Sequence, residues 1–205
     1  MTTLYQLKPR FQSALRPLVA HCAAVGVTAN GVTLTAMAVS LVLGGWLLAA
    51  GAQRSWFLLL PLWMLLRMAF NAIDGMLARE FAQKSALGAY LNELSDVVSD
   101  AALYLPFVLV APFGWASVGA VIFLSVVSEM TGALGPMIGA ERRYDGPMGK
   151  SDRAFVFGLL GLWVGLTAEL PEWSFWAMPV MAIAIPFNVF NRIRGGVESV
   201  RIPKS

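Results

Sequence analysis

Two short polar faces carry the residues of this sequence that could do chemistry. Asn71 and Asp74 are three residues apart, and Asn92, Asp96 and Asp100 follow one another at intervals of four. Residues at these intervals share one face of a helix. Their carboxylate and carboxamide oxygens are hard ligands of the kind that Mg²⁺ and Mn²⁺ prefer. The spacing therefore predicts two polar helix faces that can meet around a divalent cation.

The residues beside these faces suggest what the cation would hold. Arg79 and Lys84 lie in the turn between the two faces, where they can neutralise a diphosphate. Gly75 and Gly88 lack side chains and allow a helix or a ligand to come close. The structural alternative is that the polar groups simply bond across a helix bundle. Gathered ionisable groups within an apolar chain favour the functional interpretation.

Long apolar runs must position these faces. The chain is 58% hydrophobic and only 13% charged, whereas a soluble domain has roughly 25% charged residues. A membrane helix needs about 20 apolar residues, and lipid offers no partner for an open backbone. We therefore expect an all-α integral membrane protein of one domain. The expected spans are 32–51, 56–78, 87–111, 115–139, 154–170 and 173–191.

The basic residues fall on alternate connections of this topology. They are Lys8, Arg10, Arg16, Arg79, Lys84, Arg142, Arg143, Lys150, Arg153, Arg192, Arg194, Arg201 and Lys204. The other connections hold Arg54 with Glu169 and Glu172. The positive-inside rule places both termini in the cytosol. We therefore expect a multi-pass membrane protein, and the family resemblance given below implies a bacterial inner membrane.

The N-terminal segment has an apolar stripe at helical spacing. Its members are Leu4, Leu7, Phe11, Leu15 and Leu18. Basic residues fall off this stripe, which predicts an amphipathic helix on the cytosolic leaflet, although Pro9 and Pro17 can break it. The alternative is a buried packing helix. The expected parts of the domain are an interfacial helix over 1–25, a six-helix bundle over 26–195 and a cytosolic tail over 196–205.

The polar pattern resembles the signature of a known family. Asn71-x2-Asp74-Gly75-x2-Ala78-Arg79-x8-Gly88-x3-Asn92-x3-Asp96 is similar to D-x2-D-G-x2-A-R-x8-G-x3-D-x3-D, the motif of the CDP-alcohol phosphotransferases. Every spacing agrees. The resemblance implies six transmembrane helices with an N-terminal interfacial helix, which covers the whole chain.

The resemblance also implies roles for these residues. Asn71, Asp74, Asn92 and Asp96 would bind the metal, Mg²⁺ or Mn²⁺, and Asp96 would be the catalytic base. The nucleotide and its diphosphate would contact Asn30, Thr33, Gly75, Ala78, Arg79 and Gly88. Asn71 and Asn92 stand where the family has aspartates. A neutral carbonyl oxygen binds a cation more weakly, so either the metals bind less tightly, or one is lost, or a ligand supplies the missing charge.

Two flanking stretches complete the expected site. GVTANGVTL, residues 26–34, resembles the family's P-N-x-x-T entry to the first span, with Ala29 in place of Pro. The alternative is that Asn30 or Thr33 only caps that span. In the charged stretch 141–154, Arg143, Lys150 and Arg153 would bind the phosphate of an acceptor or of a lipid head group. The alternative there is an ordinary positive-inside loop.

The implied reaction transfers a phosphatidyl or other substituted phosphate group from a CDP-linked donor to an alcohol, with release of CMP. CDP-diacylglycerol is the expected donor, and the acceptor is a small alcohol or a phosphorylated alcohol. Membrane lipid and a second copy in a homodimer are the expected partners, and no nucleic acid is expected. The alternative is a catalytically silent relative that binds CDP-lipid or metal and acts through a partner.

Three further charged residues lie deep in the expected spans. Arg67, Asp100 and Glu129 have comparable heights, about 18 Å from the cytosolic ends of their helices. Paired charges avoid the cost of isolated burial. We therefore expect these three residues to form a buried structural ion cluster.

Overall fold

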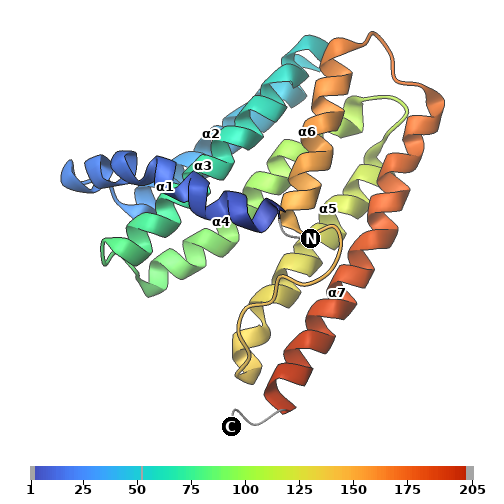
Figure 1. Ribbon diagram of the computed structural model, residues 1–205. Coiled ribbons are helices and arrows are strands. Elements are labelled where there is room, and N and C mark those ends of the chain that lie inside the picture. Colours follow the sequence, from blue (N-terminus) through green and yellow to red (C-terminus); the bar gives the residue numbers. More distant parts are fainter. Residues whose placement is uncertain (1–2, 52, 202–205) are drawn as a thin grey trace. The chain divides into compact units, whose positions relative to one another are not determined.

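The structure, a computed structural model, describes residues 3–51 and 53–201, with side chains from residue 11 onward, and consists of helices joined by loops (Figure 1). The α-helices are α1 (Thr3–Ala24), α2 (Ala29–Ala50), α3 (Leu59–Glu80), α4 (Ala86–Tyr104), α5 (Trp115–Ala133), α6 (Lys150–Leu166) and α7 (Ala177–Arg201). Short 3₁₀ helices are η1 (Arg54–Leu58), η2 (Leu105–Leu109), η3 (Gly135–Ile138) and η4 (Glu172–Trp176). The described residues contain no β-strand, so the all-α prediction is confirmed.

Several helices end where proline or a cap requires it, away from the ends that hydropathy predicted. Pro106 opens η2 just after α4 ends, and Pro136 opens η3 just after α5 ends. Helix α6 begins at Lys150, four residues before the predicted span, because the Asp152 carboxylate accepts a hydrogen bond from the Gly149 N–H at 3.1 Å. Caps and prolines thus set these ends.

In the described part of the chain, four helical segments are long and apolar enough to cross a membrane: Ala29–Ala50, Arg54–Glu80, Trp115–Ile138 and Glu172–Arg201. Helix α4 carries Glu93, Asp96 and Asp100, and α6 has only 17 residues. Those two helices therefore lack the usual composition or length of a span. The count of six spans stays a prediction.

The helices form two compact units. The first unit contains the chain up to Val39 and Leu65–Asp96, and the second contains Ser40–Met64 and the chain from Val97 onward. Helices α2, α3 and α4 contribute residues to both units. Every residue of the family-like pattern, from Asn71 to Asp96, belongs to the first unit.

In the first unit, α1 packs against α2 and α3. It is one helix through Pro9 and Pro17. The apolar core joins Val19 to α2 and α3, and Leu15 packs against that core. The remaining core members are Ala29, Val32, Ile73, Met76 and Leu77. Leu4, Leu7, Lys8 and Arg10 lie outside the described side chains.

The outer side of α1 remains open. Phe11 and Leu18 are exposed large apolar side chains, and Arg16 makes an exposed ion pair with Glu80 at 3.2 Å. Helix α1 therefore combines a packed face with exposed apolar residues, and its membrane-interfacial position stays a prediction.

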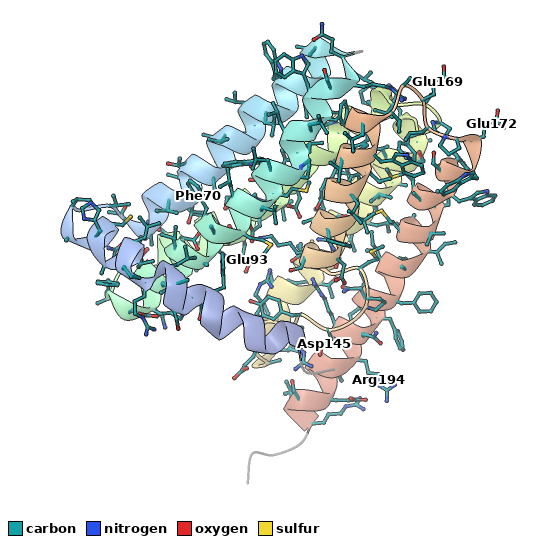
Figure 2. The ribbon with its side chains drawn as sticks, turned by 45° about the horizontal axis from the view of Figure 1, so that its top comes forward. Phe70, Glu93, Asp145, Glu169, Glu172 and Arg194 are labelled. Atoms are coloured by element: carbon teal, nitrogen blue, oxygen red, sulfur yellow. The ribbon has the colours of Figure 1, made fainter. Side chains whose placement is uncertain are left out.

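In the second unit, α5 packs along α7 (Figure 1). Tyr104 stacks on Phe157 with ring centroids 3.8 Å apart, and Phe107 packs edge-on against Phe157 at 5.2 Å. Figure 2 shows Glu169 and Glu172 near the start of α7 and Arg194 near its other end. Glu169 and Glu172 therefore lie at the opposite end of α7 from Arg194, which pairs with Glu198 at 2.7 Å.

Candidate active site

Asp74 is a buried carboxylate on α3 whose position is fixed by α2. It is 5% exposed, and Thr33 Oγ1 lies 2.7 Å from its Oδ2 atom. The same hydroxyl lies 3.0 Å from the Ala29 carbonyl. Because a hydroxyl has one proton, it donates to one acceptor at a time, and the carboxylate is the stronger acceptor. Thr33 thus fixes Asp74 directly.

The start of α2 is capped by a residue that the sequence analysis did not nominate. Thr28 Oγ1 accepts a hydrogen bond from the Gly31 N–H at 3.1 Å, which is the usual N-cap geometry. The expectation that Asn30 or Thr33 merely caps this helix is wrong, because Thr28 makes the cap. The Ala29 N–H donates to Gln83 Oε1 at 2.6 Å, which ties the entry of α2 to the turn after α3.

The Asp96 carboxylate on α4 forms an ion pair with the Arg67 guanidinium on α3. Arg67 Nη2 donates to Asp96 Oδ1 at 3.3 Å and to the Asp96 carbonyl at 3.2 Å. The side chains of the pair are 6% and 15% exposed. In so little water an ion pair is strong, and the loss of either partner is costly. Arg67 is therefore a neighbour of the expected base.

Two glycines of the pattern leave room for neighbouring polar side chains. A Cβ atom on Gly88 would lie 2.8 Å from Asn30 Oδ1 and 3.0 Å from Ser85 Oγ. A Cβ atom on Gly75 would lie 3.0 Å from an Nη atom of Arg79. The absence of a side chain thus allows Asn30 to approach α4 and allows the Arg79 guanidinium to fold back along α3.

The four metal-binding candidates of the pattern differ in burial: Asp74 is buried and Asp96 is half-buried. Asn71 is half-buried, and Asn92 is exposed. Within residues 3–51 and 53–201, no group of three or more His, Cys, Asp and Glu side chains could hold a metal ion. The oxygen donors of the pattern are two carboxylates and two carboxamides. This set suits a hard divalent cation, with a lower negative charge than four carboxylates would supply.

The charged loop between α5 and α6 belongs to the second unit and lies tightly against that unit's helices. A Cβ atom on Gly132 would lie 2.6 Å from the Arg143 carbonyl, and one on Gly135 would lie 2.6 Å from the Glu141 carbonyl. A Cβ atom on Gly195 would lie 2.5 Å from Arg143 Nη2. Small residues on α5, η3 and α7 thus let the loop backbone and the Arg143 side chain approach.

The three residues expected to bind a phosphate have different surroundings. Arg153 is fully buried and donates to Glu129 at 2.8 Å and to the Met148 carbonyl at 2.8 Å. Arg143 makes two hydrogen bonds to Asp145, at 2.7 and 3.0 Å. Lys150 is half-buried at the first position of α6.

Sequence reasoning did not nominate the polar residues of α7. Asn188 and Arg192 are buried. Arg192 Nη1 donates to the Ser128 carbonyl at 2.5 Å, and Ser128 Oγ donates to Asn188 Oδ1 at 2.7 Å. The available signal was the four-residue interval between Asn188 and Arg192, which places them on one helix face.

Part of the expected deep ion cluster is present. Asp100 and Glu129 share one cation, since Arg153 Nη2 lies 4.0 Å from Asp100 and 2.8 Å from Glu129. Arg67 pairs with Asp96. The approach of Arg67 to the other two acids stays a prediction.

Similar proteins agree with this architecture. The chain is 46% identical over 192 residues to the inner membrane protein YnbA of Escherichia coli K12, covering 94% of this chain and 95% of that protein. Its fold is similar to that of the Mycobacterium tuberculosis phosphatidylinositol phosphate synthase PgsA1 in complex with manganese and citrate. That match has a TM-score of 0.70 and 18% identity, and covers 88% of this chain and 87% of the other.

The same synthase with CDP-DAG bound gives a TM-score of 0.65 at 20% identity, over 88% of this chain and 92% of that one. These likenesses show the fold. The four apolar helical segments and the inner-membrane relative together identify a multi-pass membrane protein. Residues 26–190, which include the whole polar pattern, match the CDP-alcohol phosphatidyltransferase family, and the chain belongs to that family.

Proposed function

We propose that this protein transfers a phosphatidyl group from a CDP-linked donor, CDP-diacylglycerol, to an alcohol and releases CMP. The observation that carries the proposal is the family match over residues 26–190, with the aspartates that the family pattern retains held in place by Thr33 and Arg67. The CDP-DAG complex of the structurally similar synthase supports the choice of donor.

Asp74 and Asp96, with the carbonyl oxygens of Asn71 and Asn92, would hold Mg²⁺ or Mn²⁺. The donor set fits such an ion, since all four side chains offer hard oxygens. When bound, the metal neutralises charge on the non-bridging phosphate oxygens and orients the CMP leaving group. The manganese complex of the similar synthase supports this assignment.

The chain's own residues would position the substrates and move one proton. The acceptor oxygen attacks the lipid-side phosphorus of the donor, the bond from that phosphorus to the CMP oxygen breaks, and the acceptor proton passes to the Asp96 carboxylate. Arg67 holds that carboxylate in place. Asn30, Thr33, Ala78 and Arg79 would contact the nucleotide and its diphosphate, with Gly75 and Gly88 leaving room for them.

We also propose the membrane arrangement that the sequence predicts. Six helices would cross a bacterial inner membrane, α1 would lie at the cytosolic interface, and both termini would be cytosolic. The basic loop between α5 and α6 supports this orientation. The division into 1–25, 26–195 and 196–205, and a homodimer, are parts of the same proposal.

The test is CMP release from CDP-diacylglycerol by the purified protein with Mn²⁺, over a panel of alcohols. Asp96→Asn should lower the rate by at least about 100-fold, the usual contribution of a general base. Glu169→Asn, at an exposed connection, is the control. Equal rates for Asp96→Asn and the wild type would contradict the assignment of Asp96 as base.

A catalytically silent binding protein is the second candidate. Two observations favour it: the pattern has two asparagines in place of aspartates, and Asp96 forms an ion pair with Arg67. Such a protein would be stabilised by CDP-diacylglycerol in a thermal-unfolding assay without releasing CMP from it. Turnover with any alcohol would exclude this candidate.

A further inference from the structure

The tryptophans of this chain are confined to the second unit. The sequence contains seven of them, and all seven belong to that unit. We call the five exposed members the tryptophan band: Trp46, Trp56, Trp115, Trp173 and Trp176. They stand near the end of the first apolar segment and near the starts of the other three. Tryptophan is enriched where a helix leaves the hydrocarbon of a membrane, so this distribution indicates a membrane boundary.

Contacts within the second unit bring the ends of α2 and α6 together. Trp46 and Trp56 pack edge to face with ring centroids 5.7 Å apart. Arg54, two residues before Trp56, donates to the Thr167 carbonyl at 3.3 Å, and Thr167 directly follows α6. The first part of the tryptophan band therefore lies beside the end of α6.

Further contacts continue the tryptophan band to α7 and α5. Trp163, near the end of α6, has its ring centroid 5.3 Å from that of Trp173. Phe175 packs edge to face against Trp176 at 5.7 Å. An apolar groove lies between the starts of α5 and α7, with Trp115 on one side and Phe175 on the other. The whole tryptophan band thus lies at one end of the second unit.

The surface of α7 stays uncharged over about one membrane thickness beyond the tryptophan band. The sequence has no Lys, Arg, Asp or Glu between Trp176 and Arg192. Arg192 is buried, and Arg194 is the first exposed charge. It follows Trp176 by 18 residues, which is about 27 Å of helix against about 30 Å of hydrocarbon in a bilayer. The large exposed side chains between them include Val180, Ile183, Phe187 and Phe190.

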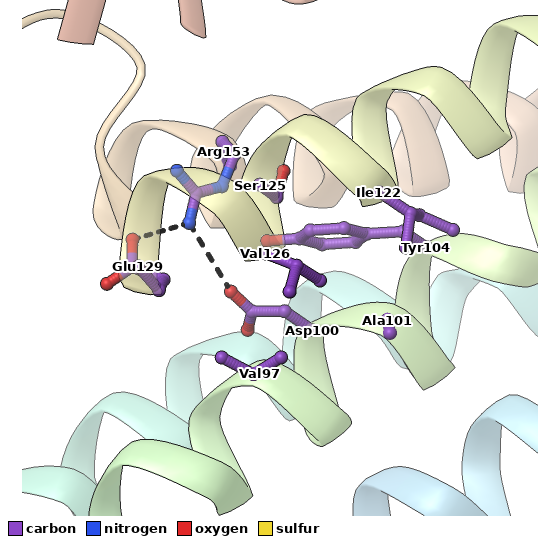
Figure 3. Close-up of a pocket in the computed structure, with 9 residues that line it drawn as sticks. All are labelled: Val97, Asp100, Ala101, Tyr104, Ile122, Ser125, Val126, Glu129 and Arg153. Carbon is purple, nitrogen blue, oxygen red and sulfur yellow. Dashed lines mark hydrogen bonds and ion pairs between the residues drawn. The ribbon is translucent and has the colours of Figure 1, made fainter. Parts of the chain in front are cut away.

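The charged side chains that lie closer to the tryptophan band are buried and paired. Figure 3 shows Arg153 between Glu129 and Asp100, with dashed lines to both carboxylates. Glu129 follows Trp115 by 14 residues, about 21 Å along α5. Charges at hydrocarbon depth face the protein interior and pair with one another. The burial of Glu129 and Arg153, at 4% and 0% exposure, agrees with a hydrocarbon boundary at the tryptophan band.

The indole side chain matches a lipid boundary because it combines a large apolar ring with one N–H donor. Trp115, Trp173 and Trp176 are 67%, 66% and 64% exposed. Acyl chains would contact these rings, and oxygens of the headgroup region would accept from their N–H groups. The tryptophan band is also continuous with the exposed apolar side chains of α7, which membrane lipid covers. Lipid therefore accounts for both the apolar and the polar part of this surface.

We propose that the tryptophan band binds the boundary between headgroups and acyl chains in one leaflet, the leaflet opposite Arg194. Its partner is membrane lipid, and the tryptophan band fixes the depth of the second unit from that side of the bilayer. This inference is independent of the proposed transferase function, since it uses no residue of the polar pattern.

The first test measures the depth of the indole rings. The full chain is reconstituted in phosphatidylcholine vesicles that contain a lipid brominated either near the headgroup or near the chain end, since bromine quenches tryptophan fluorescence by contact. We expect the shallow bromines to quench at least about twofold more than the deep ones. Stronger quenching by the deep bromines would overturn the proposal. Quenching by aqueous acrylamide with little effect of either lipid would also overturn it, and protection from all three quenchers would indicate a protein partner instead of lipid.

The second test measures anchoring in phosphatidylcholine vesicles with short, medium and long acyl chains. The ratio of shallow to deep quenching should stay constant in the wild type, because the tryptophan band follows its boundary. In the triple variant Trp46→Leu, Trp115→Leu, Trp176→Leu, the remaining tryptophans should lose at least about half of that ratio in the thickest bilayer. Phe123→Leu with Phe187→Leu, the same kind of change at exposed positions away from the tryptophan band, should behave as the wild type.

A constant ratio in the folded triple variant would overturn the anchoring role. If the triple variant does not fold, the wild-type measurements decide, because a ratio that falls with bilayer thickness in the wild type contradicts the proposal by itself. Neither test depends on CMP release, so a failure of the transferase assay leaves both of them valid.

Discussion

Arg67 Nη2 lies 3.3 Å from Asp96 Oδ1, and the guanidinium also donates to the Asp96 main-chain carbonyl at 3.2 Å. A side chain of α3 thus holds a fixed positive charge against the residue of α4 that we propose as base and metal ligand. The pattern's asparagines remove two negative charges relative to the family motif. The positive charge of Arg67 makes the net charge of the site less negative still, so the site should bind divalent cations weakly.

Replacement of Arg67 by methionine should therefore tighten Mn²⁺ binding by about tenfold, because a nearby positive charge that repels the ion is removed. Electron paramagnetic resonance of free Mn²⁺ measures the affinity. Arg67→Lys should stay close to the wild type, and Arg194→Met, at an exposed pair with Glu198, serves as the control. Unchanged affinity in Arg67→Met would mean that Asp96 does not ligate the ion.

Restoring the family's aspartates should also tighten the binding of Mn²⁺. Asn71→Asp and Asn92→Asp each add a carboxylate to the proposed donor set, and each should tighten Mn²⁺ binding by about tenfold. In the absence of metal, the double variant should unfold at a lower temperature because its carboxylates repel one another. Asn191→Asp, an exposed change on α7, controls for general surface charge; an equal gain there would contradict the prediction.

Loss of the Thr33 hydroxyl should weaken both the fold and the site. Thr33→Val keeps the shape and removes the donor to Asp74, which should cost about 1–3 kcal/mol of unfolding free energy because a buried carboxylate loses a partner. Thermal unfolding and CMP release measure the two effects. Thr33→Ser restores the donor. Thr35→Val removes an exposed hydroxyl from the same helix, and a loss as large as in Thr33→Val would refute the specific role of Thr33.

Two adjacent glycines of α2 should respond oppositely to alanine. A Cβ atom on Gly44 would overlap the Ala102 carbonyl of α4, whereas one on Gly45 would meet no atom within 4 Å. Gly44→Ala should destabilise the protein by about 1–3 kcal/mol through overpacking, and Gly45→Ala should be neutral or slightly stabilising. Thermal unfolding of the two variants in one detergent tests the contact, and equal stabilities would show that α2 and α4 do not approach there.

Apolar runs and turn composition were sufficient to predict the helices, because hydrophobic length is a local property of the chain. The family pattern likewise nominated Asp74 and Asp96, and their role as metal ligands stays a prediction. The prediction of ion pairs from the heights of residues along their helices was weaker. The height of a residue does not say toward which neighbouring helix its side chain points. The partner of Arg67 therefore became visible only in three dimensions, where Asp96 lies beside it.

The arginine cluster illustrates a second limit. Arg142, Arg153 and Arg192 come from a loop and two helices that are separated by many residues, and their meeting point at Glu129 depends on packing that no single segment contains. The sequence analysis expected Arg153 to bind the phosphate of an acceptor or of a lipid head group. Its complete burial, at 0% exposure, comes from the way α6 packs within its unit.

The tight packing of the stretch between α5 and α6 also limits where other sequences can be inserted into this protein. That stretch approaches Gly132 and Gly135 so closely that no side chain fits between them, so an epitope or fluorescent reporter inserted there would displace it. The connection after α6 is more suitable for topology mapping, because Ala168 and Glu169 are exposed there. Fusions at that connection would report membrane sidedness from an undisturbed chain.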